Sequence, residues 1–264
     1  MRVRLICCVT CVAWAIAGLA PLTTLAEDQT DNPVLIGAGV RTIPAYDGAS
    51  TNVWQLIPIL RYYGKPWFAR TTQGVLEGGA RIEPAKGFAL GVQAAYEGGR
   101  PTRESAFLRE HNVENIGVSA SVGVHAELDR SIGPMPVTYL LRLRPDVDRS
   151  QGAQADLRIT AGVYGGERLE AGIYVQATWA DRTSNQSYYG ITPQQASTTG
   201  LPAYEAGGGL QKTYAGLLWS FDLSREWMLV GGVDALLMRG AAARSPLVQD
   251  RSNTYVSVAL AYRF

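Results

Sequence analysis

The sequence has only three cysteines, and all of them lie within its first 11 residues. Two arginines precede an apolar stretch over residues 5–19, and small residues surround Ala26, which is the layout of a secretory signal peptide. We expect residues 1–26 to be cleaved and residues 27–33 to form a short periplasmic N-terminal segment. The mature chain then has no cysteine, which excludes disulfides and thiolate metal sites.

The sequence also lacks a long hydrophobic run after this leader, since no apolar stretch approaches the roughly 20 residues of a membrane helix. Neither sign of charge dominates, with 24 basic and 23 acidic residues, so the chain offers no basic field for nucleic acid. Glycine (29), tyrosine (13) and tryptophan (6) supply the small and aromatic side chains that membrane barrels use in turns and interfacial belts. If such a chain spans a membrane, it does so with strands.

Apolar residues alternate with small or polar residues in nearly every segment after the leader. In Asn253–Phe264 (NTYVSVALAYRF), valine, leucine and aromatic residues take one parity, and mostly small or polar residues take the other. Asn115–Leu128 and Leu169–Trp179 show the same period of two. An apolar face opposite a polar one is what a barrel wall between lipid and lumen requires.

The strand count depends on the segment Pro66–Pro84. This segment is too long for one strand and contains Gln73-Gly74, so we interpret it as two short strands joined by a tight turn. The total is then about twelve strands, with ten and fourteen as alternatives, and both termini lie in the periplasm. The sequence therefore predicts an all-β fold, a transmembrane antiparallel β-barrel over residues 34–264, with its long loops at the cell surface.

The polar parity of the strands carries charges of both signs. We expect these residues to line the lumen: His125, Glu127, Arg142, Arg144, Asp156, Arg158 and Glu170. Because an isolated charge is costly to desolvate, such groups either form an ion-pair network that fills a narrow barrel or line a small aqueous pore. We favour a mostly occluded interior.

Candidate catalytic residues are few. His111 lies near Ser105 in a charged segment, where a nucleophile and a base would have to meet. His125 shares its parity with Glu127, an arrangement that suits a proton relay or a bound cation. We favour a structural role for each histidine, and we expect no catalytic residue, no cofactor and no metal.

The last strand also carries a candidate targeting signal. Val258, Leu260, Tyr262 and Phe264 resemble the C-terminal signature that the barrel-assembly machinery of bacterial outer membranes recognises. The resemblance implies that this chain is a client of that machinery and is inserted into the outer membrane of a Gram-negative cell.

The segment Ser187–Gln211 (SYYGITPQQASTTGLPAYEAGGGLQ), together with Arg244–Phe264 and Val34–Ser50, resembles the MipA/OmpV family of outer-membrane proteins. That family is named in part for interaction with the lytic transglycosylase MltA. Isoleucine at position 191 stands where the family pattern has valine. The residues that match the family's loop are candidates for a lid or a ligand contact: Tyr188, Tyr189, Gly190, Pro193, Gly200, Leu201, Pro202 and Tyr204. The alternative is an ordinary structural cap over the barrel mouth.

The family resemblance implies a scaffold without enzymatic activity, which brings a lytic transglycosylase and a penicillin-binding protein together in envelope maintenance. The alternatives are a small-solute channel and a surface-exposed adhesin or ligand-binding barrel. We expect contact with outer-membrane lipid and none with nucleic acid. The periplasmic turns are predicted to be short, with Asp129–Pro136 among them. A protein partner would therefore have only the shallow periplasmic rim of the barrel to bind.

Overall fold

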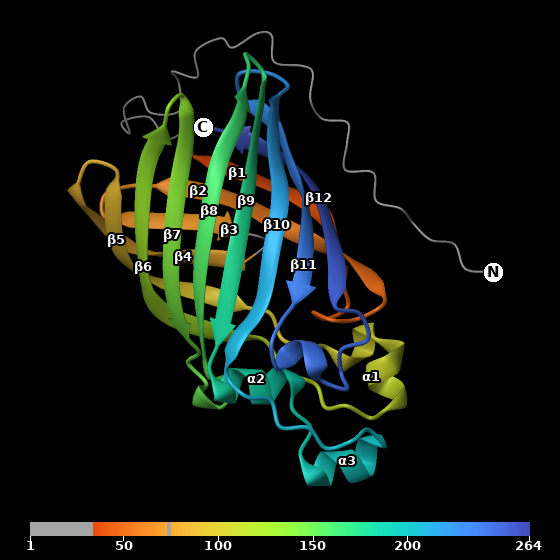
Figure 1. The fold of residues 1–264 in the computed structure, drawn as a ribbon. Coiled ribbons are helices and arrows are strands. Elements are labelled where there is room, and N and C mark those ends of the chain that lie inside the picture. The colour runs from red at the N-terminus through yellow and green to blue at the C-terminus, as the bar shows by residue number, and fades with distance from the viewer. Residues whose placement is uncertain (1–33, 73–74) are drawn as a thin grey trace.

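The computed structural model describes residues 34–72 and 75–264, so the predicted signal peptide and the segment 27–33 lie outside the described residues. Within this part of the chain, twelve antiparallel strands close into a barrel in which β12 pairs with β1 (Figure 1). The strands are β1 (Leu35–Pro44), β2 (Asn52–Tyr63), β3 (Trp67–Thr72), β4 (Val75–Ala85), β5 (Phe88–Glu97), β6 (Ser119–Ile132), β7 (Met135–Pro145), β8 (Ala153–Gly165), β9 (Leu169–Ala180), β10 (Gly209–Asp222), β11 (Trp227–Met238) and β12 (Ser252–Arg263). The predicted barrel of about twelve strands is confirmed, including the division of Pro66–Pro84 into β3 and β4.

Short helices occupy the connections at one end of the barrel, opposite the end that carries the C-terminus (Figure 1). They are η1 (Thr102–Glu104), α1 (Ala106–Glu110), η2 (Arg149–Gln151), α2 (Arg182–Tyr189), α3 (Pro193–Thr199) and η3 (Ala242–Arg244). No helix in residues 34–72 or 75–264 has the length and apolarity needed to cross a membrane. We call the end of the barrel that carries the short helices the cap end, and the end that carries the C-terminus the turn end.

The barrel wall is apolar outside and largely polar inside, the reverse of a soluble protein. On β12, Val256, Val258 and Leu260 are 45%, 42% and 41% exposed, whereas Ala259 and Ala261 on the inner face are 4% and 0% exposed. Exposed leucine, isoleucine and valine recur on the outward parity of the other strands. Lipid contact explains this pattern, because hydrocarbon is the only solvent in which such a surface is stable.

Both ends of the described chain meet at the turn end, where Phe264 N donates a hydrogen bond to Val34 O at 3.0 Å. The predicted turn Asp129–Pro136 is wrong, since β6 continues to Ile132 and only residues 133 and 134 separate it from β7. The longer ladder is favoured because Thr138 Oγ1 donates to Asp129 Oδ1 at 2.6 Å across it. The tips of hairpins β6–β7, β8–β9 and β10–β11 therefore project at the top of Figure 1.

The start of β6 also differs from the sequence prediction. Alternation begins at Asn115, but the strand begins at Ser119. Ile116 instead forms an isolated antiparallel bridge with Arg100 in the preceding connection. The four residues before the strand thus belong to the structure that covers the barrel mouth, because their backbone partners lie there and not in β5.

Candidate functional site

Four connections at the cap end fold over the barrel mouth and share one apolar core. They are the segments 45–51, 98–118, 181–208 and 239–251. Each of the four contributes buried side chains to one cluster: Ala45, Tyr46, Ala49, Leu108, Val113, Ile191 and Leu247. Because all four connections bury side chains against one another, they form one folded unit, which we call the outer cap.

The candidate loop residues lie in the segment 181–208, which forms helices α2 and α3. Pro193 occupies the first turn of α3, where its fixed φ suits a helix start, and Thr192 and Gln195 complete a capping box. Gly200 ends α3 with a φ of 69°, a left-handed conformation that favours glycine. This part of the family pattern therefore specifies the boundaries of a helix.

The tyrosines of this loop hold the outer cap together. Tyr189 is buried, and Tyr204 Oη donates to Ala241 O at 2.7 Å. Tyr188 Oη donates to Gln151 Oε1 at 3.1 Å, which links the loop to the β7–β8 connection. Their contacts are made within the protein, so the structure gives these three side chains a role in stabilising the cap.

The remaining candidate loop residues divide between core and surface. Leu201 packs against the apolar core of the outer cap, whereas Pro202 is exposed. Gly190 lines a polar surface cleft of about 730 Å³ between the segments 98–118 and 181–208.

An ion pair beneath the outer cap fastens it to the barrel. Asp47 Oδ2 lies 2.6 Å from Lys212 Nζ of β10, and Tyr255 Oη of β12 donates to Asp47 Oδ1 at 2.5 Å. Burial alone would raise the pKa of Asp47, but the charge of Lys212 and the hydrogen bonds from Lys212 and Tyr255 outweigh it and lower the pKa. We call these three residues the cap latch.

The inner wall of β3, β4 and β6–β8 carries a network of alternating charges. Glu77 accepts from Arg70 at 2.5 Å and from Arg142 at 3.0 Å, and its side chain is fully buried. Asp156, also fully buried, lies 3.3 Å from Arg142 and 2.9 Å from Arg144. The ion network consists of Glu127, Arg70, Glu77, Arg142, Asp156 and Arg144.

Sequence reasoning missed Arg70 and the members of the cap latch. A signal for Arg70 existed, since a two-residue turn at 73–74 places Arg70 opposite Glu77, which is the register observed. No such local signal exists for the pair of Asp47 and Lys212, which are 165 residues apart.

The histidines do not assemble a catalytic site. His125 is 4% exposed and packs edge-on against Phe68 at 5.0 Å, so Phe68 lies inside the lumen. His111 Nδ1 lies 2.9 Å from Thr199 O, while Ser105 Oγ accepts from Leu108 N as the cap of α1. His111 and Ser105 therefore have structural partners.

A cavity of about 710 Å³ lies in the lumen beside the ion network. Its wall carries Arg158, Glu127 and Glu170, three of the residues expected there. The cavity extends to Tyr63 and Pro136 near the turn end, and Glu170 is exposed. The lumen therefore combines an ion network with a polar cavity, and the outer cap covers its other end.

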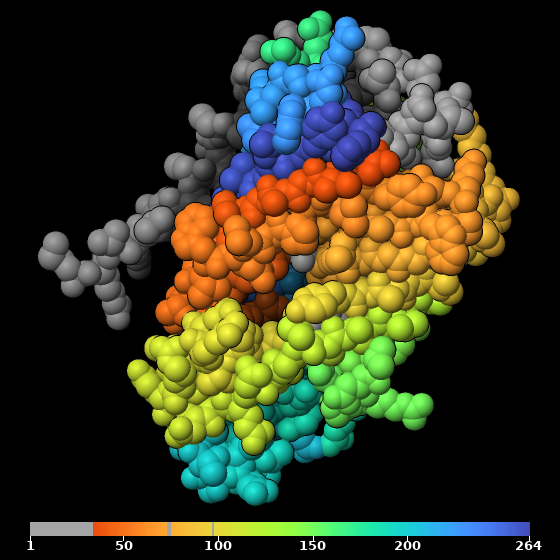
Figure 2. All heavy atoms as spheres, turned by 180° about the vertical axis from the view of Figure 1, so that it is seen from behind, coloured from red at the N-terminus to blue at the C-terminus, as the bar shows by residue number. Residues whose placement is uncertain are grey.

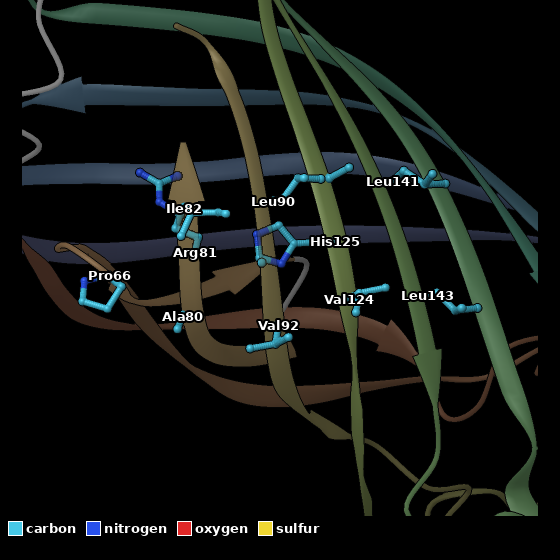
Figure 3. A pocket seen from close by; sticks show the side chains of 12 residues that line it. Pro66, Ala80, Arg81, Ile82, Leu90, Val92, Val124, His125, Leu141 and Leu143 are labelled. Carbon is cyan, nitrogen blue, oxygen red and sulfur yellow. The ribbon is translucent and has the colours of Figure 1, made fainter. Parts of the chain in front are cut away.

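An apolar hollow of about 690 Å³ lies on the outer face of β4–β7. Figure 3 shows the side chains that form its sides, among them Ile82, Leu90, Val92, Val124, Leu141 and Leu143. These six are 38–64% exposed on the lipid-facing parity. The hollow is a part of the wall that acyl chains fill.

The four residues of the C-terminal signature lie at the turn end of β12. Val258 and Leu260 face lipid, and Phe264 is 71% exposed. The rings of Tyr262 and Phe264 meet at 4.8 Å, and Trp227 packs against Tyr262 at 5.1 Å. This aromatic group lies at the membrane boundary, where amphipathic rings are favoured.

A closed barrel with a lipid-facing wall, short turns at one end and a folded cap at the other defines an outer-membrane β-barrel protein. Residues 36–264 match the family model described as MltA-interacting protein MipA, and the chain belongs to this family. It resides in the outer membrane of a Gram-negative cell. Because bacterial barrels have short turns in the periplasm and long loops outside, we expect the turn end to face the periplasm and the outer cap to face the cell exterior.

Comparison with solved structures gives the fold alone. The NanC porin shares 9% identity with the chain at a TM-score of 0.51, covering 88% of this chain and 100% of the porin. The COG4313 outer membrane channel from Pseudomonas putida F1 has 9% identity and a TM-score of 0.44, over 88% of this chain and 96% of the channel. LpxR from Salmonella typhimurium has 10% identity and a TM-score of 0.42, over 86% of this chain and 100% of LpxR. No curated protein sequence matches the chain.

Proposed function

We propose that this protein is a non-enzymatic outer-membrane barrel that binds a peptidoglycan-processing enzyme at its periplasmic rim. The observation that carries the proposal is the contrast between the two ends of the barrel. The outer end is covered by a folded cap, whereas hairpins project from the inner end. The family description, MltA-interacting protein, supports a lytic transglycosylase as the partner. A penicillin-binding protein is a second proposed partner, which the family resemblance of the sequence alone implies.

The projecting hairpins supply the surface for this contact. Ile132 at the tip of β6 is 57% exposed, and Tyr164 near the tip of β8 is 53% exposed. Apolar and aromatic side chains of this kind are the anchors of protein interfaces. The projecting hairpins offer more surface at the periplasmic rim than short turns would. This favours a stable interface of about 800 Å² on each side.

The absence of enzymatic activity is part of the same proposal. His125 packs against Phe68, and His111 Nδ1 lies 2.9 Å from Thr199 O, so neither histidine is paired with a nucleophile in these contacts. Among residues 34–72 and 75–264, no three acidic, histidine or cysteine side chains group in a way that would hold a metal ion. These observations favour binding over catalysis.

Ile132→Asp should weaken retention of the lytic transglycosylase by immobilised full-length protein roughly tenfold, because it places an unpaired charge in the interface. Gln194→Asp is the matched control, since it adds the same charge to exposed α3 on the opposite side of the membrane. Affinity is measured with the purified partner by surface plasmon resonance. Equal retention by the wild type, both variants and an unrelated barrel would refute the proposal.

Passage of a small solute is the second candidate function, and the cavity of about 710 Å³ favours it. The route would require the outer cap to move, because its core closes the mouth from four connections. In this function the cap latch acts as the closing device, so disruption of Asp47 would increase conductance.

A further inference from the structure

The barrel wall has an incomplete seam between β2 and β3. β2 pairs with β1 over ten residues, from Asn52 to Arg61, but it pairs with β3 only at Arg61, Tyr62 and Tyr63. Within the described residues, the length of β2 from 52 to 60 therefore has one neighbouring strand. Figure 2 shows a hollow in the wall at this place, between orange β2 and the yellow segment that includes β5.

The free edge of β2 exposes backbone groups at the depth of the wall. Leu60 N donates to Thr71 Oγ1 at 3.2 Å, so its N–H points toward β3. Because N–H groups alternate along a strand, those of Trp54 and Leu56 point the same way. Pro58 shares this direction and has no N–H, as expected for a strand edge. Trp54 and Leu56 are 75% and 81% exposed.

The cavity of the lumen reaches this seam. Ile57, Ile59 and Leu60 line it on the β2 side, and Thr71 and Thr72 line it on the β3 side. The polar cavity therefore lies directly behind the free edge of β2. The β2 side of the seam is apolar, because Ile57 and Ile59 form it. Ile57 is 6% exposed, and Ile59 packs against the inner cluster that contains Leu35.

Three arginines of the cavity, Arg61, Arg70 and Arg158, each have a buried guanidinium donor without an acceptor in the described chain, and Arg70 is already held in the ion network. Arg158 is 7% exposed, its Nη1 has no hydrogen-bond partner, and its guanidinium stacks on the Tyr174 ring at 3.6 Å. Arg61 Nε is also buried and without a partner. A buried donor of this kind is costly unless something accepts from it, and a carboxylate or a phosphate is the strongest acceptor.

We propose that the seam and the cavity together form a binding site for an anionic amphiphile, a carboxylate or phosphate head group on a single acyl chain. The head group accepts hydrogen bonds from Arg158 or Arg61 inside the lumen. The acyl chain passes between Ile57 and Thr72 to the outer surface beside Leu56. A soluble anion would use only the cationic half of this site, and an uncharged acyl chain only the apolar half.

The test titrates delipidated full-length protein in a non-ionic detergent with decanoate, decyl phosphate, butyrate and inorganic phosphate by isothermal calorimetry. Arg158→Gln should weaken both decyl ligands about tenfold or more, since it removes a charged donor. Ile57→Trp, which narrows the opening, should weaken the decyl ligands and leave butyrate unchanged. The controls are Arg225→Gln in an exposed turn and Ile173→Trp on the lipid face, neither of which should change binding.

A cross-link tests the seam in a single protein. Leu60→Cys with Thr71→Cys places two thiols across it, where the Leu60 N to Thr71 Oγ1 contact is 3.2 Å. Oxidation should block the decyl ligands, and reduction of the same sample should restore them. The proposal is overturned if no decyl ligand binds, if butyrate and phosphate bind as tightly as their decyl counterparts, or if oxidation leaves binding unchanged. Comparison of decanoate with decyl phosphate identifies the preferred head group.

Discussion

Glu77→Gln should lower the free energy of unfolding by about 3–5 kcal/mol, the largest effect we expect from a single substitution. Glu77 is fully buried between Arg70 and Arg142, at 2.5 and 3.0 Å. Glutamine keeps the size of the side chain but removes the negative charge. The buried guanidinium groups of Arg70 and Arg142 then lose the carboxylate that lies between them. Urea unfolding in lipid vesicles, followed by tryptophan fluorescence, measures the change.

Glu167→Gln provides the matched control, because Glu167 lies exposed in the turn between β8 and β9. It should change the free energy of unfolding by less than about 0.5 kcal/mol. A loss at Glu77→Gln as small as that of the control would mean that the ion network contributes little to the barrel. The double variant Glu77→Gln, Arg142→Gln should recover part of the loss, because it removes one of the uncompensated charges.

Asp47→Asn should increase the rate at which the outer cap opens by about 10- to 100-fold. The charged hydrogen bonds from Lys212 and Tyr255, at 2.6 and 2.5 Å, stabilise the closed cap, and bonds of this kind contribute about 1.5–3 kcal/mol. Hydrogen–deuterium exchange of the segment 45–51 measures the opening, since its amides bond within the cap when it is closed. Asp148→Asn, at an exposed position, should leave exchange unchanged.

The same latch predicts a pH dependence with a defined sign. The pKa of Asp47 is lower in the folded protein than its ordinary value of about 3.9. Its contribution is therefore complete above about pH 4 and is lost as the pH falls through the folded pKa. Exchange of the segment 45–51, corrected for the intrinsic rate, should stay constant from pH 8 to 5 and rise toward pH 3. Identical profiles for the wild type and Asp47→Asn would contradict the role of the latch.

The sequence predicts the barrel well because the period of two is a local property. Each valine or leucine on the outward parity of β12 identifies the lipid-facing side of that strand. Successive strands are antiparallel, so the direction of one strand gives the direction of the next. The division of Pro66–Pro84 into two strands can be predicted for the same reason, although the predicted turn at Gln73-Gly74 lies outside the described residues. Alternation together with the even strand number of bacterial barrels therefore predicts about twelve strands.

The site is less predictable, because its contacts join residues that are distant in sequence. The cap latch joins Asp47 to a strand 165 residues away, and the core of the outer cap draws on four separate connections. Parity says that Phe68 faces one side of a short strand but not which side, and packing against His125 decides it. The gap beside β2 is equally hidden, because an unpaired strand and a paired one have the same alternation.

The most direct test of the account is photocross-linking in cells. A benzophenone amino acid at position 132 reports from the periplasmic rim, and the same group at position 198 reports from the exposed face of α3. We predict that a peptidoglycan-processing enzyme is cross-linked from position 132 and not from position 198. Cross-linking of that enzyme from neither position, or from position 198 alone, would contradict a partner held at the turn end.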